Sequence, residues 1–578
     1  MTPRTARLRM SLAVLVIFAL VAVFIVRLVD IQLVNAAEIN ADSYNKRAQS
    51  LTTYGVRGSI VDTNGAILAA SVERYDITAS PRSALARPDT NGSVSDALAK
   101  IAVITKQDPA QLMAALTANP TSDFTYLTKG VILDVFQKVR ALNIPWVYFE
   151  LRPARTYPNG ATAGNLVGFT GTDGAQAGVE LTADKCLAST NGSATYEKGE
   201  DGTRLPGSLV TTQLPKDGGT VKLTIDRDLQ WYVQQRIAQT YQSLGATWAT
   251  AVVIRVKDGH LMAVADYPSV DPNNVNGVPN TALGSLAFSQ PYEPGSTMKA
   301  LTAASLIDAG ALTPVSQVTA PSLLYLSDGS YIKDAFSHGD IRYTLAGALV
   351  DSSNIAVSLF SKPVSADLRR SYMIKFGLNS KTEVNFNGEA EGDVHPVSQW
   401  DERTNVAVQF GQGMTATSVQ MASIYQTLGN GGVRMPVTLV EGCTHPDGSV
   451  TDLPPTTGTR AVSASAASQT LQMLEQIVTQ GYLSDKLTIP GYRVAAKTGT
   501  AQVADGKGGY GDAAVISVAG VAPAENPQYA VVVTAGIPSS MYSSGAIAST
   551  FHDVMAQVLT TYRVPPSTTP AVSIPLRW

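Results

Sequence analysis

The segment PGSTMK at residues 294–299 places Ser296 three residues before Lys299. Residues three apart on a helix lie on the same face, so the lysine amine can reach the serine hydroxyl. A serine needs a base before its hydroxyl attacks a carbonyl carbon, and a lysine can be that base once burial and a nearby cation lower its pKa. The N–H groups of a first helical turn also stabilise a developing oxyanion. The segment therefore predicts acyl transfer through a nucleophilic serine.

The same serine-lysine spacing occurs twice more, at Ser43 and Lys46 and at Ser330 and Lys333. We interpret both pairs as ordinary surface residues, because one lies beside an apolar segment and the other in a loop-like stretch. Serine and lysine are also common capping and surface residues at the start of a helix. The spacing alone does not identify a nucleophile.

Two further motifs follow Ser296 along the chain. SSN at residues 352–354 begins 56 residues after Ser296, and KTGT at residues 497–500 begins 201 residues after it. An S-x-N match also occurs at residues 189–191, whereas K-T-G occurs once. The three motifs, in the order S-x-x-K, S-x-N and K-T-G, resemble the superfamily of serine penicillin-binding proteins and β-lactamases.

The resemblance implies a role for each matching residue in the first two motifs. Ser296 attacks the carbonyl of a D-alanyl-D-alanine peptide, and Lys299 takes its proton. Ser352 relays that proton to the leaving D-alanine nitrogen. Asn354 holds the amide of the donor stem peptide and orients Lys299. The oxyanion hole of the family uses backbone N–H groups, here those of Ser296 and Thr500.

The KTGT motif is expected on a strand beside the nucleophile. Its lysine, Lys497, brings a second positive charge that keeps Lys299 neutral and attracts the substrate carboxylate. The hydroxyls of Thr498 and Thr500 are expected to bind that carboxylate. Gly499 is expected to leave room for a substrate that lies along the strand as an added strand. An amine on another stem peptide then attacks the acyl-enzyme and completes a cross-link.

The composition of the 578-residue chain limits the classes of partner and cofactor that we expect. It is 44% hydrophobic and 15% charged with a formal charge of -3, so it lacks the basic surplus of nucleic-acid-binding proteins. The five histidines are scattered, and the two cysteines have no C-x-x-C spacing, so we expect no metal and no other cofactor. Cys186 and Cys443 can pair in an oxidising compartment, but we expect two buried free thiols.

An apolar run from Met10 to Val26 nearly spans a bilayer of ~30 Å. Arginines precede this run, and the positive-inside rule keeps such an end in the cytoplasm. We therefore expect a cytoplasmic tail at residues 1–9, a transmembrane anchor at residues 10–29, and an extracytoplasmic remainder. A cleaved secretory signal is the alternative, since residues 34–36 resemble a cleavage site, but the run exceeds an ordinary signal core.

Two domains are expected after the anchor, giving an α+β protein. Residues 30–221 are predicted to form an extended pedestal domain of mixed helices and strands. It has a hairpin around Asn64-Gly65 and helices at residues 109–116 and 131–142. Residues 222–563 read as the catalytic domain, which begins with a helix capped by Asp226. Apolar runs there predict strands of one antiparallel sheet, and helical patterns lie between them. The predicted strands are 250–256, 260–265, 514–521 and 529–535, the predicted helices are 296–309 and 418–428, and the Pro-rich tail 564–578 is expected to be extended or mobile.

The sequence around the motifs resembles that of class B penicillin-binding proteins, in which a dimerisation pedestal precedes the transpeptidase domain. The segments that carry this resemblance are 57–69, 155–158, 178–180, 292–296 and 411–413. Residues 54–60 look closest to septal, division-type members, with an elongation-type enzyme as the alternative. The implied partners are peptidoglycan stem peptides, a polytopic SEDS-family glycan polymerase, other divisome proteins, and β-lactams as covalent inhibitors.

Other activities of the superfamily stay open. A class A β-lactamase is disfavoured, because Ser353 replaces the aspartate of its S-D-N motif and Glu383, Glu389 and Glu391 form no E-x-x-L-N pattern. A β-lactam on Ser296 should therefore stay bound. A class D-like β-lactamase, or a non-catalytic scaffold or β-lactam-sensing receptor, is compatible with the same motifs.

Overall fold

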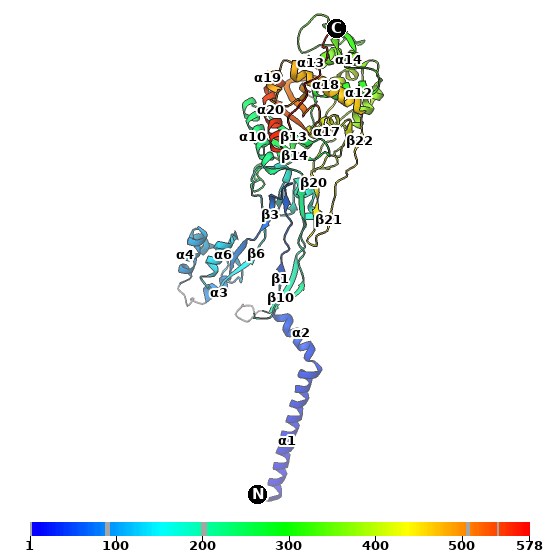
Figure 1. The fold of residues 1–578 in the computed structure, drawn as a ribbon. Coiled ribbons are helices and arrows are strands. Elements are labelled where there is room, and N and C mark those ends of the chain that lie inside the picture. Colours follow the sequence, from blue (N-terminus) through cyan, green and yellow to red (C-terminus); the bar gives the residue numbers. More distant parts are fainter. Residues whose placement is uncertain (1–2, 87–92, 198–204, 505–508, 540–542) are drawn as a thin grey trace. The chain divides into compact units, whose positions relative to one another are not determined.

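The computed structural model of the chain describes residues 3–86, 93–197, 205–504, 509–539 and 543–578 (Figure 1). The chain divides into two compact units, each built from several segments. Unit 1 comprises Met1–Val56, Tyr75–Pro153 and Ser189–Asp217, and unit 2 comprises Arg57–Arg74, Ala154–Ala188 and Gly218–Trp578.

The chain begins with the helix α1 (Pro3–Val29), which continues through the π-helical turn η1 (Asp30–Val34) and is followed by α2 (Ala36–Arg47). Within Arg7–Val34, the most apolar stretch of 18 residues has a mean hydropathy of 3.1, and none of that stretch is buried. Within the part of the chain that the structure describes, this is the one helix long and apolar enough to cross a membrane. The predicted apolar helix is confirmed.

Unit 1 also contains two three-stranded sheets. The first has the order β5-β4-β6 and buries a small core against its helices, while the second has the order β1-β10-β11. Both helices predicted in this stretch form, and α5 begins with Asp108 as its cap and Pro109 in its first turn. The strands are β1 (Ala48–Thr53), β4 (Tyr75–Ala79), β5 (Thr125–Val131), β6 (Val147–Leu151), β10 (Gly192–Glu197) and β11 (Val210–Gln213). The helices are α3 (Pro81–Ala86), α4 (Val94–Thr105), α5 (Pro109–Thr117) and α6 (Leu133–Arg140).

A six-stranded sheet in unit 2 joins strands from both predicted domains, in the order β21-β20-β12-β2-β3-β7. The hairpin predicted around Asn64-Gly65 is β2-β3, with Gly65 at a φ of 84°. Because β12 pairs with β2 on one side and β20 on the other, the compact units do not follow a linear boundary near residue 222. The strands are β2 (Ile60–Val61), β3 (Ile67–Val72), β7 (Ala154–Thr156), β12 (Thr220–Leu223), β20 (Val440–Thr444) and β21 (Val450–Thr451).

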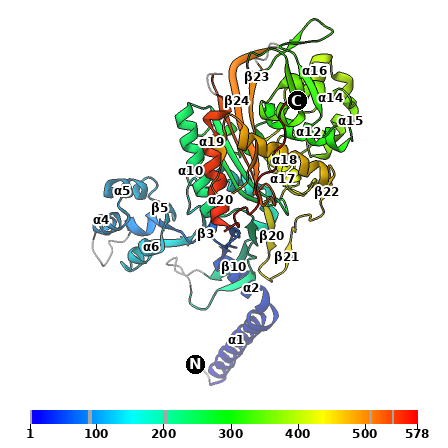
Figure 2. The same ribbon diagram turned by 45° about the horizontal axis from the view of Figure 1, so that its top comes forward.

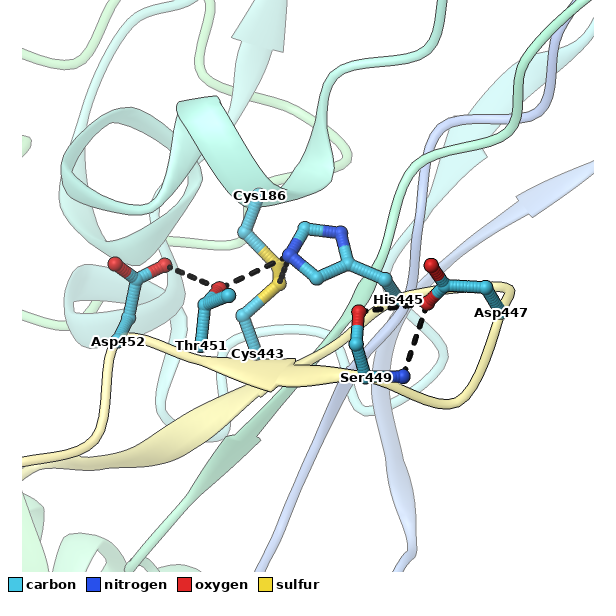
Figure 3. Close-up of a disulfide and its surroundings, with 7 residues drawn as sticks. All are labelled: Cys186, Cys443, His445, Asp447, Ser449, Thr451 and Asp452. Atoms are coloured by element: carbon cyan, nitrogen blue, oxygen red, sulfur yellow. Dashed lines mark hydrogen bonds between the residues drawn. A yellow bond between two sulfur atoms is a disulfide. The ribbon is translucent and has the colours of Figure 1, made fainter.

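A disulfide between Cys186 and Cys443 links two segments of unit 2 that lie 257 residues apart (Figure 3). The expectation of free thiols is therefore wrong, although both residues are buried as predicted. Gly219 makes the approach possible, since a Cβ there would lie 2.8 Å from Cys443 Sγ and 3.0 Å from Cys186 Sγ. His445 Nε2 lies 3.6 Å from Cys443 Sγ and hydrogen-bonds to Thr451 Oγ1.

The catalytic part of unit 2 is built on a five-stranded antiparallel sheet in the order β14-β13-β25-β24-β23, which confirms the predicted α+β fold. Alternate side chains of β13 enter separate cores, Val252 and Ile254 on one face and Ala251 and Val253 on the other. Helices α10 and α20 cover one face, and α12 and α17 cover the other (Figure 2). The strands are β13 (Trp248–Arg255), β14 (Leu261–Tyr267), β23 (Ala495–Ala504), β24 (Tyr510–Ala522) and β25 (Tyr529–Ile537). The helices are α10 (Arg227–Leu244), α12 (Lys299–Asp308), α17 (Ser418–Gly429), α18 (Ala464–Gln480) and α20 (Ala548–Thr561), and Asp226 caps α10 as predicted.

Short elements complete unit 2. The helices are α7 (Gly164–Val167), α8 (Gly178–Thr182), α9 (Asp184–Leu187), α11 (Leu286–Ser289), α13 (Leu345–Val350), α14 (Asn354–Ser361), α15 (Ala366–Lys375), α16 (Glu402–Ala407) and α19 (Ser484–Leu487). Two-stranded pairs are β8 (Thr170–Gly171) with β9 (Gly174–Ala175), β15 (Gln317–Ala320) with β18 (Ile341–Thr344), β16 (Leu324–Tyr325) with β17 (Tyr331–Ile332), and β19 (Val433–Arg434) with β22 (Thr459–Arg460). The Pro-rich tail is extended, as predicted, but it is held against the domain: Ile574 is buried and Gln476 of α18 donates to the carbonyl of Val572.

Candidate active site

The nucleophile motif lies where a 3-10 turn, Gly295–Met298, continues directly into α12 at Lys299. The predicted helix from residue 296 therefore begins with a tighter turn and ends at Asp308. Gly295 has a φ of 56°, and a Cβ there would lie 3.0 Å from the carbonyl oxygen of Thr500. Gly411 packs on the other side, where a Cβ would lie 2.2 Å from the Gly295 oxygen. Gly295 thus allows the turn that bears Ser296 to lie against β23, and Gly411 lies close against the other side of that turn.

The amine of Lys299 is fully buried in a set of oxygen acceptors. Its Nζ donates to the backbone oxygen of Ser352 at 2.5 Å and to Asn354 Oδ1 at 2.7 Å, and it lies 3.3 Å from Ser352 Oγ. Lys497, also fully buried on β23, places its Nζ 3.0 Å from the same Ser352 hydroxyl. The structure therefore brings together the lysines of the first and third motifs around the serine of the second.

The pKa values of the two lysines are shifted downward. Burial is the largest cause for Lys299, the positive charge of Lys497 is the second, and together they hold the Lys299 pKa well below 10.5, while Asp334 opposes them. Burial lowers the pKa of Lys497 to about 7. Both amines therefore lose a proton more readily than an exposed lysine does.

Ser296, the predicted nucleophile, is half-buried. Among the residues that the structure describes, no hydrogen bond joins Ser296 Oγ to the Lys299 amine. Catalytic hydrogen bonds often tighten only when substrate is bound, so the looser geometry is compatible with general-base catalysis. The two residues lie on adjacent turns, Ser296 on the 3-10 turn and Lys299 at the start of α12.

The remaining KTGT residues lie on β23, the last strand in the order of the five-stranded sheet. Thr498 is buried and Thr500 is exposed, with Thr500 Oγ1 accepting a hydrogen bond from the Ser544 N–H. Gly499 also has a packing role. A Cβ there would lie 2.9 Å from the Pro294 oxygen and 2.6 Å from Ser517 Oγ, so the glycine lets the nucleophile turn pack on the strand. Its expected role in leaving room for substrate stays a prediction.

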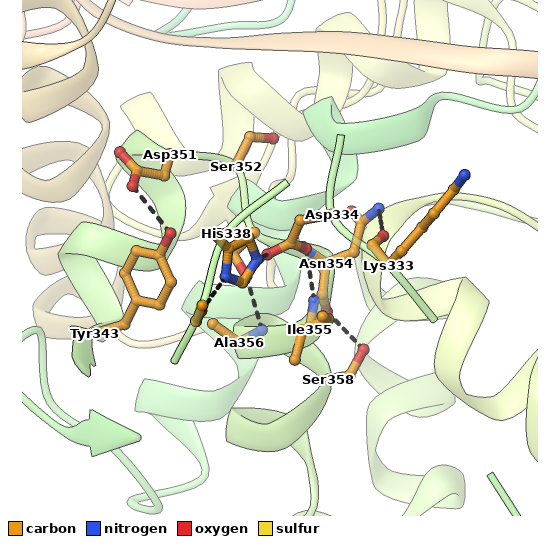
Figure 4. A network of polar contacts seen from close by, with 12 residues as sticks. Lys333, Asp334, His338, Tyr343, Asp351, Ser352, Asn354, Ile355, Ala356 and Ser358 are labelled. Atoms are coloured by element: carbon orange, nitrogen blue, oxygen red, sulfur yellow. Dashed lines mark hydrogen bonds and ion pairs between the residues drawn. The ribbon is translucent and has the colours of Figure 1, made fainter. Parts of the chain in front are cut away.

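The loop that carries Ser352 is fixed by a residue that sequence reasoning missed, Asp334 (Figure 4). Its buried carboxylate accepts hydrogen bonds from the N–H of Asn354 at 2.6 Å and from Ser353 Oγ at 2.6 Å, which caps the start of α14. His338 Nε2 lies 3.1 Å from the same carboxylate. Asp334 directly follows one of the serine-lysine pairs dismissed as surface residues, and no local pattern links it to a helix 20 residues away.

The rival matches have ordinary roles in the structure. Ser330 hydrogen-bonds to Asp328, and Lys46 pairs with Asp42 on the exposed face of α2. The hydroxyl of Ser189, in the second S-x-N match, donates to the backbone of Gly55. In the described ranges, no group of three His, Cys, Asp or Glu side chains is placed to hold a metal.

Three of the family-like segments before the catalytic domain meet in one buried ion-pair cluster. Glu180 has no exposed side-chain surface, Arg155 Nε lies 2.6 Å from it, and Arg57 Nε lies 2.8 Å from it. These residues come from the segments at 57–69, 155–158 and 178–180. The cluster ties β7 and the segment before β2 to α8.

A serine-lysine pair on one helical segment, a Ser-x-Asn loop and a Lys-Thr-Gly strand at the end of a five-stranded sheet define the class of serine penicillin-binding proteins and β-lactamases. Residues 249–556 match the transpeptidase domain of penicillin-binding proteins, and residues 52–223 match the penicillin-binding protein dimerisation domain. The chain therefore belongs to the class B penicillin-binding proteins, in which both domains occur in one chain, and it is a serine-type transpeptidase.

Individual relatives agree with this assignment over most of the chain. Penicillin-binding protein PbpB of Mycobacterium tuberculosis is 33% identical over 97% of this chain and 86% of its own length. Peptidoglycan D,D-transpeptidase FtsI of Escherichia coli K12 is 30% identical over 91% of this chain and 86% of its own. A peptidoglycan synthetase structure from Bifidobacterium adolescentis has a TM-score of 0.73 with 30% identity, covering 92% of this chain and 100% of that one. Penicillin-binding protein 3 from M. tuberculosis, complexed with aztreonam, has a TM-score of 0.70 with 28% identity, covering 91% and 100%.

Proposed function

We propose that this chain is a peptidoglycan D,D-transpeptidase of septal cell-wall synthesis, which forms an acyl-enzyme on Ser296 and cross-links stem peptides. One observation carries the proposal: the Ser352 hydroxyl lies within 3.3 Å of Lys299 Nζ and 3.0 Å of Lys497 Nζ, beside the turn that bears Ser296. A hydroxyl between two amines of lowered pKa can pass protons in both directions.

Acylation begins with the proton of Ser296. A neutral Lys299 amine has two N–H groups, for which the Ser352 carbonyl and Asn354 Oδ1 are acceptors, and its lone pair is left to accept a proton. Ser296 Oγ then bonds to the carbonyl carbon of the penultimate D-alanine, and the amide bond to the terminal D-alanine breaks. The proton travels from Lys299 through the Ser352 hydroxyl to the leaving nitrogen.

The rest of the motif binds the donor peptide. The N–H groups of Ser296 and Thr500 stabilise the oxyanion, and a protonated Lys497 together with Thr498 and Thr500 attracts the terminal carboxylate. The position of β23 at the end of the sheet order allows a peptide to pair with it as an added strand. An amine of a second stem peptide then attacks the ester, and Ser296 recovers its proton as the cross-link forms.

The predicted membrane anchor suggests on which side of the membrane the reaction takes place. Arginines before the apolar helix favour a cytoplasmic N-terminus in the cell membrane and a catalytic domain outside it. A polytopic SEDS-family polymerase that supplies glycan strands, and other divisome proteins, are the partners that this placement suggests. The septal role rests on residues 54–60 and on the similarity to FtsI, and an elongation role is the alternative.

A class D-like β-lactamase is the main rival, because it is compatible with the same three motifs. The test is to treat the purified chain with penicillin and follow both its intact mass and free penicillin. We expect a persistent adduct and little turnover, whereas rapid steady-state hydrolysis would identify a β-lactamase.

A further inference from the structure

The last residues of the chain pack against the helix that leads into the Ser-x-Asn motif. Thr344, the cap of α13, donates its hydroxyl to the carbonyl of Pro575 at 2.6 Å, and its N–H bonds to the Leu576 oxygen at 3.2 Å. Gly347 lies within α13, where glycine costs about 1 kcal/mol relative to alanine. A Cβ at this position would lie 1.8 Å from the Leu576 oxygen, so the glycine is explained by the passage of the tail.

Arg577 reaches from this tail to Asp351, the residue directly before Ser352. Its guanidinium forms an ion pair with Asp351 Oδ2 and lies 4.4 Å from the centre of the Tyr343 ring. The hydroxyl of Tyr343, a fully buried residue, donates to the same carboxylate oxygen at 2.9 Å. A cation and a hydroxyl thus hold one carboxylate from two directions.

The backbone between these anchors is strained. Ser352 has a φ of 57°, a left-handed conformation that non-glycine residues adopt only when their surroundings impose it. On its C-terminal side, Asp334 holds Ser353 and Asn354. On its N-terminal side, the holding contacts are those of Asp351 with Arg577 and Tyr343. The strained serine is the residue whose hydroxyl lies near both catalytic lysines.

We propose that Arg577 is a positioning residue: the ion pair of Arg577 with Asp351, supported by Tyr343, holds Ser352 in the strained conformation that places its hydroxyl near Lys299 and Lys497. This inference rests on the proposed function and deepens it, because it assigns the tail a part in the proton relay. Arg577 touches no reacting atom, so its removal should slow the chemical step without weakening the initial binding of a β-lactam.

The experiment uses the full chain in detergent and stopped-flow acylation by a fluorescent penicillin. Fitting the rate against penicillin concentration separates the first-order acylation constant from the half-saturating concentration. In Arg577→Ala we expect the acylation constant to fall roughly tenfold or more, since small misplacements of catalytic groups have effects of that size. We expect the half-saturating concentration to change by less than about twofold and Arg577→Lys to recover part of the rate.

Matched variants separate positioning from stability. Arg236→Ala removes an arginine-aspartate pair of similar exposure between α10 and α20, on the opposite face of the sheet, and should acylate at the wild-type rate. Tyr343→Phe removes only the second donor to Asp351 and should also slow acylation. It tests the inference independently if Arg577→Ala folds poorly. Equal acylation constants in wild type, Arg577→Ala and Tyr343→Phe would overturn this inference and leave the proposed function intact. A wild-type chain that is not acylated at all would instead contradict the proposed function.

Discussion

Lys497 Nζ lies 3.0 Å from the hydroxyl of Ser352, and the contact places a second cation close to the amine of Lys299. The two lysines lie far apart in the sequence, one on β23 and one at the start of α12. Their mutual repulsion adds to burial in lowering the pKa of Lys299, so the geometry couples the K-T-G motif to the basicity of the general base.

The first prediction concerns the pH dependence of acylation in Lys497→Met. Acylation requires neutral Lys299, so its rate rises with pH through the Lys299 pKa, which in wild type lies well below 10.5. Methionine removes the positive charge that lowers this pKa, and the acidic limb of the profile should move to higher pH. Penicillin acylation rates measured across pH, with folding checked at each pH by thermal unfolding, test the shift. An unchanged limb, or one moved to lower pH, contradicts the proposed coupling.

The second prediction is that the acidic limb moves in the opposite direction in Asp334→Asn. The negative charge of Asp334 raises the pKa of Lys299, so Asp334→Asn should move the acidic limb to lower pH. The lost carboxylate also leaves Ser353 and Asn354 less well held, which should lower the free energy of unfolding by about 1–3 kcal/mol. Asp328→Asn, in an exposed loop of the same segment, is the matched control. A limb that moves to higher pH would argue against the assigned electrostatics.

The third prediction addresses the ion-pair cluster of unit 2. Glu180→Ala removes the carboxylate shared by Arg57 and Arg155. Arg57 keeps its ion pair with Asp184, but the buried charge of Arg155 loses its partner, which should cost about 3–5 kcal/mol of unfolding free energy. Asp134→Ala breaks an exposed pair with Lys138 and should change stability by no more than about 0.5 kcal/mol. Denaturant unfolding measures both, and equal effects of the two substitutions would contradict the proposed role of the cluster.

The fourth prediction concerns the disulfide between Cys186 and Cys443. A thiol reagent added to denatured, unreduced protein should detect no free thiol, and reduction should release two. Cys443→Ala should lower the free energy of unfolding by about 2–4 kcal/mol under non-reducing conditions, because the unfolded chain loses a long covalent loop. Two reactive thiols before reduction would rule out the bond in the isolated protein.

Residue patterns predicted much of the fold and the members of the site. The alternating runs that became β13, β14, β24 and β25 carry their own periodicity, and the motif residues are contiguous in sequence. What could not be predicted depends on long-range packing. Asp334 acts on a helix 20 residues away, Cys186 bonds to a partner 257 residues away, and Gly499 packs against the nucleophile turn. None of these contacts leaves a local signal.

The central claim is that Ser296 catalyses peptide cross-linking. The most direct test is reconstitution of the full chain with lipid-linked precursor and a candidate glycan polymerase, followed by muramidase digestion and mass spectrometry of the products. We predict cross-linked muropeptides with wild type and none with Ser296→Ala, while the polymerase makes glycan strands in both reactions. Cross-links formed at an undiminished rate by Ser296→Ala would contradict the account.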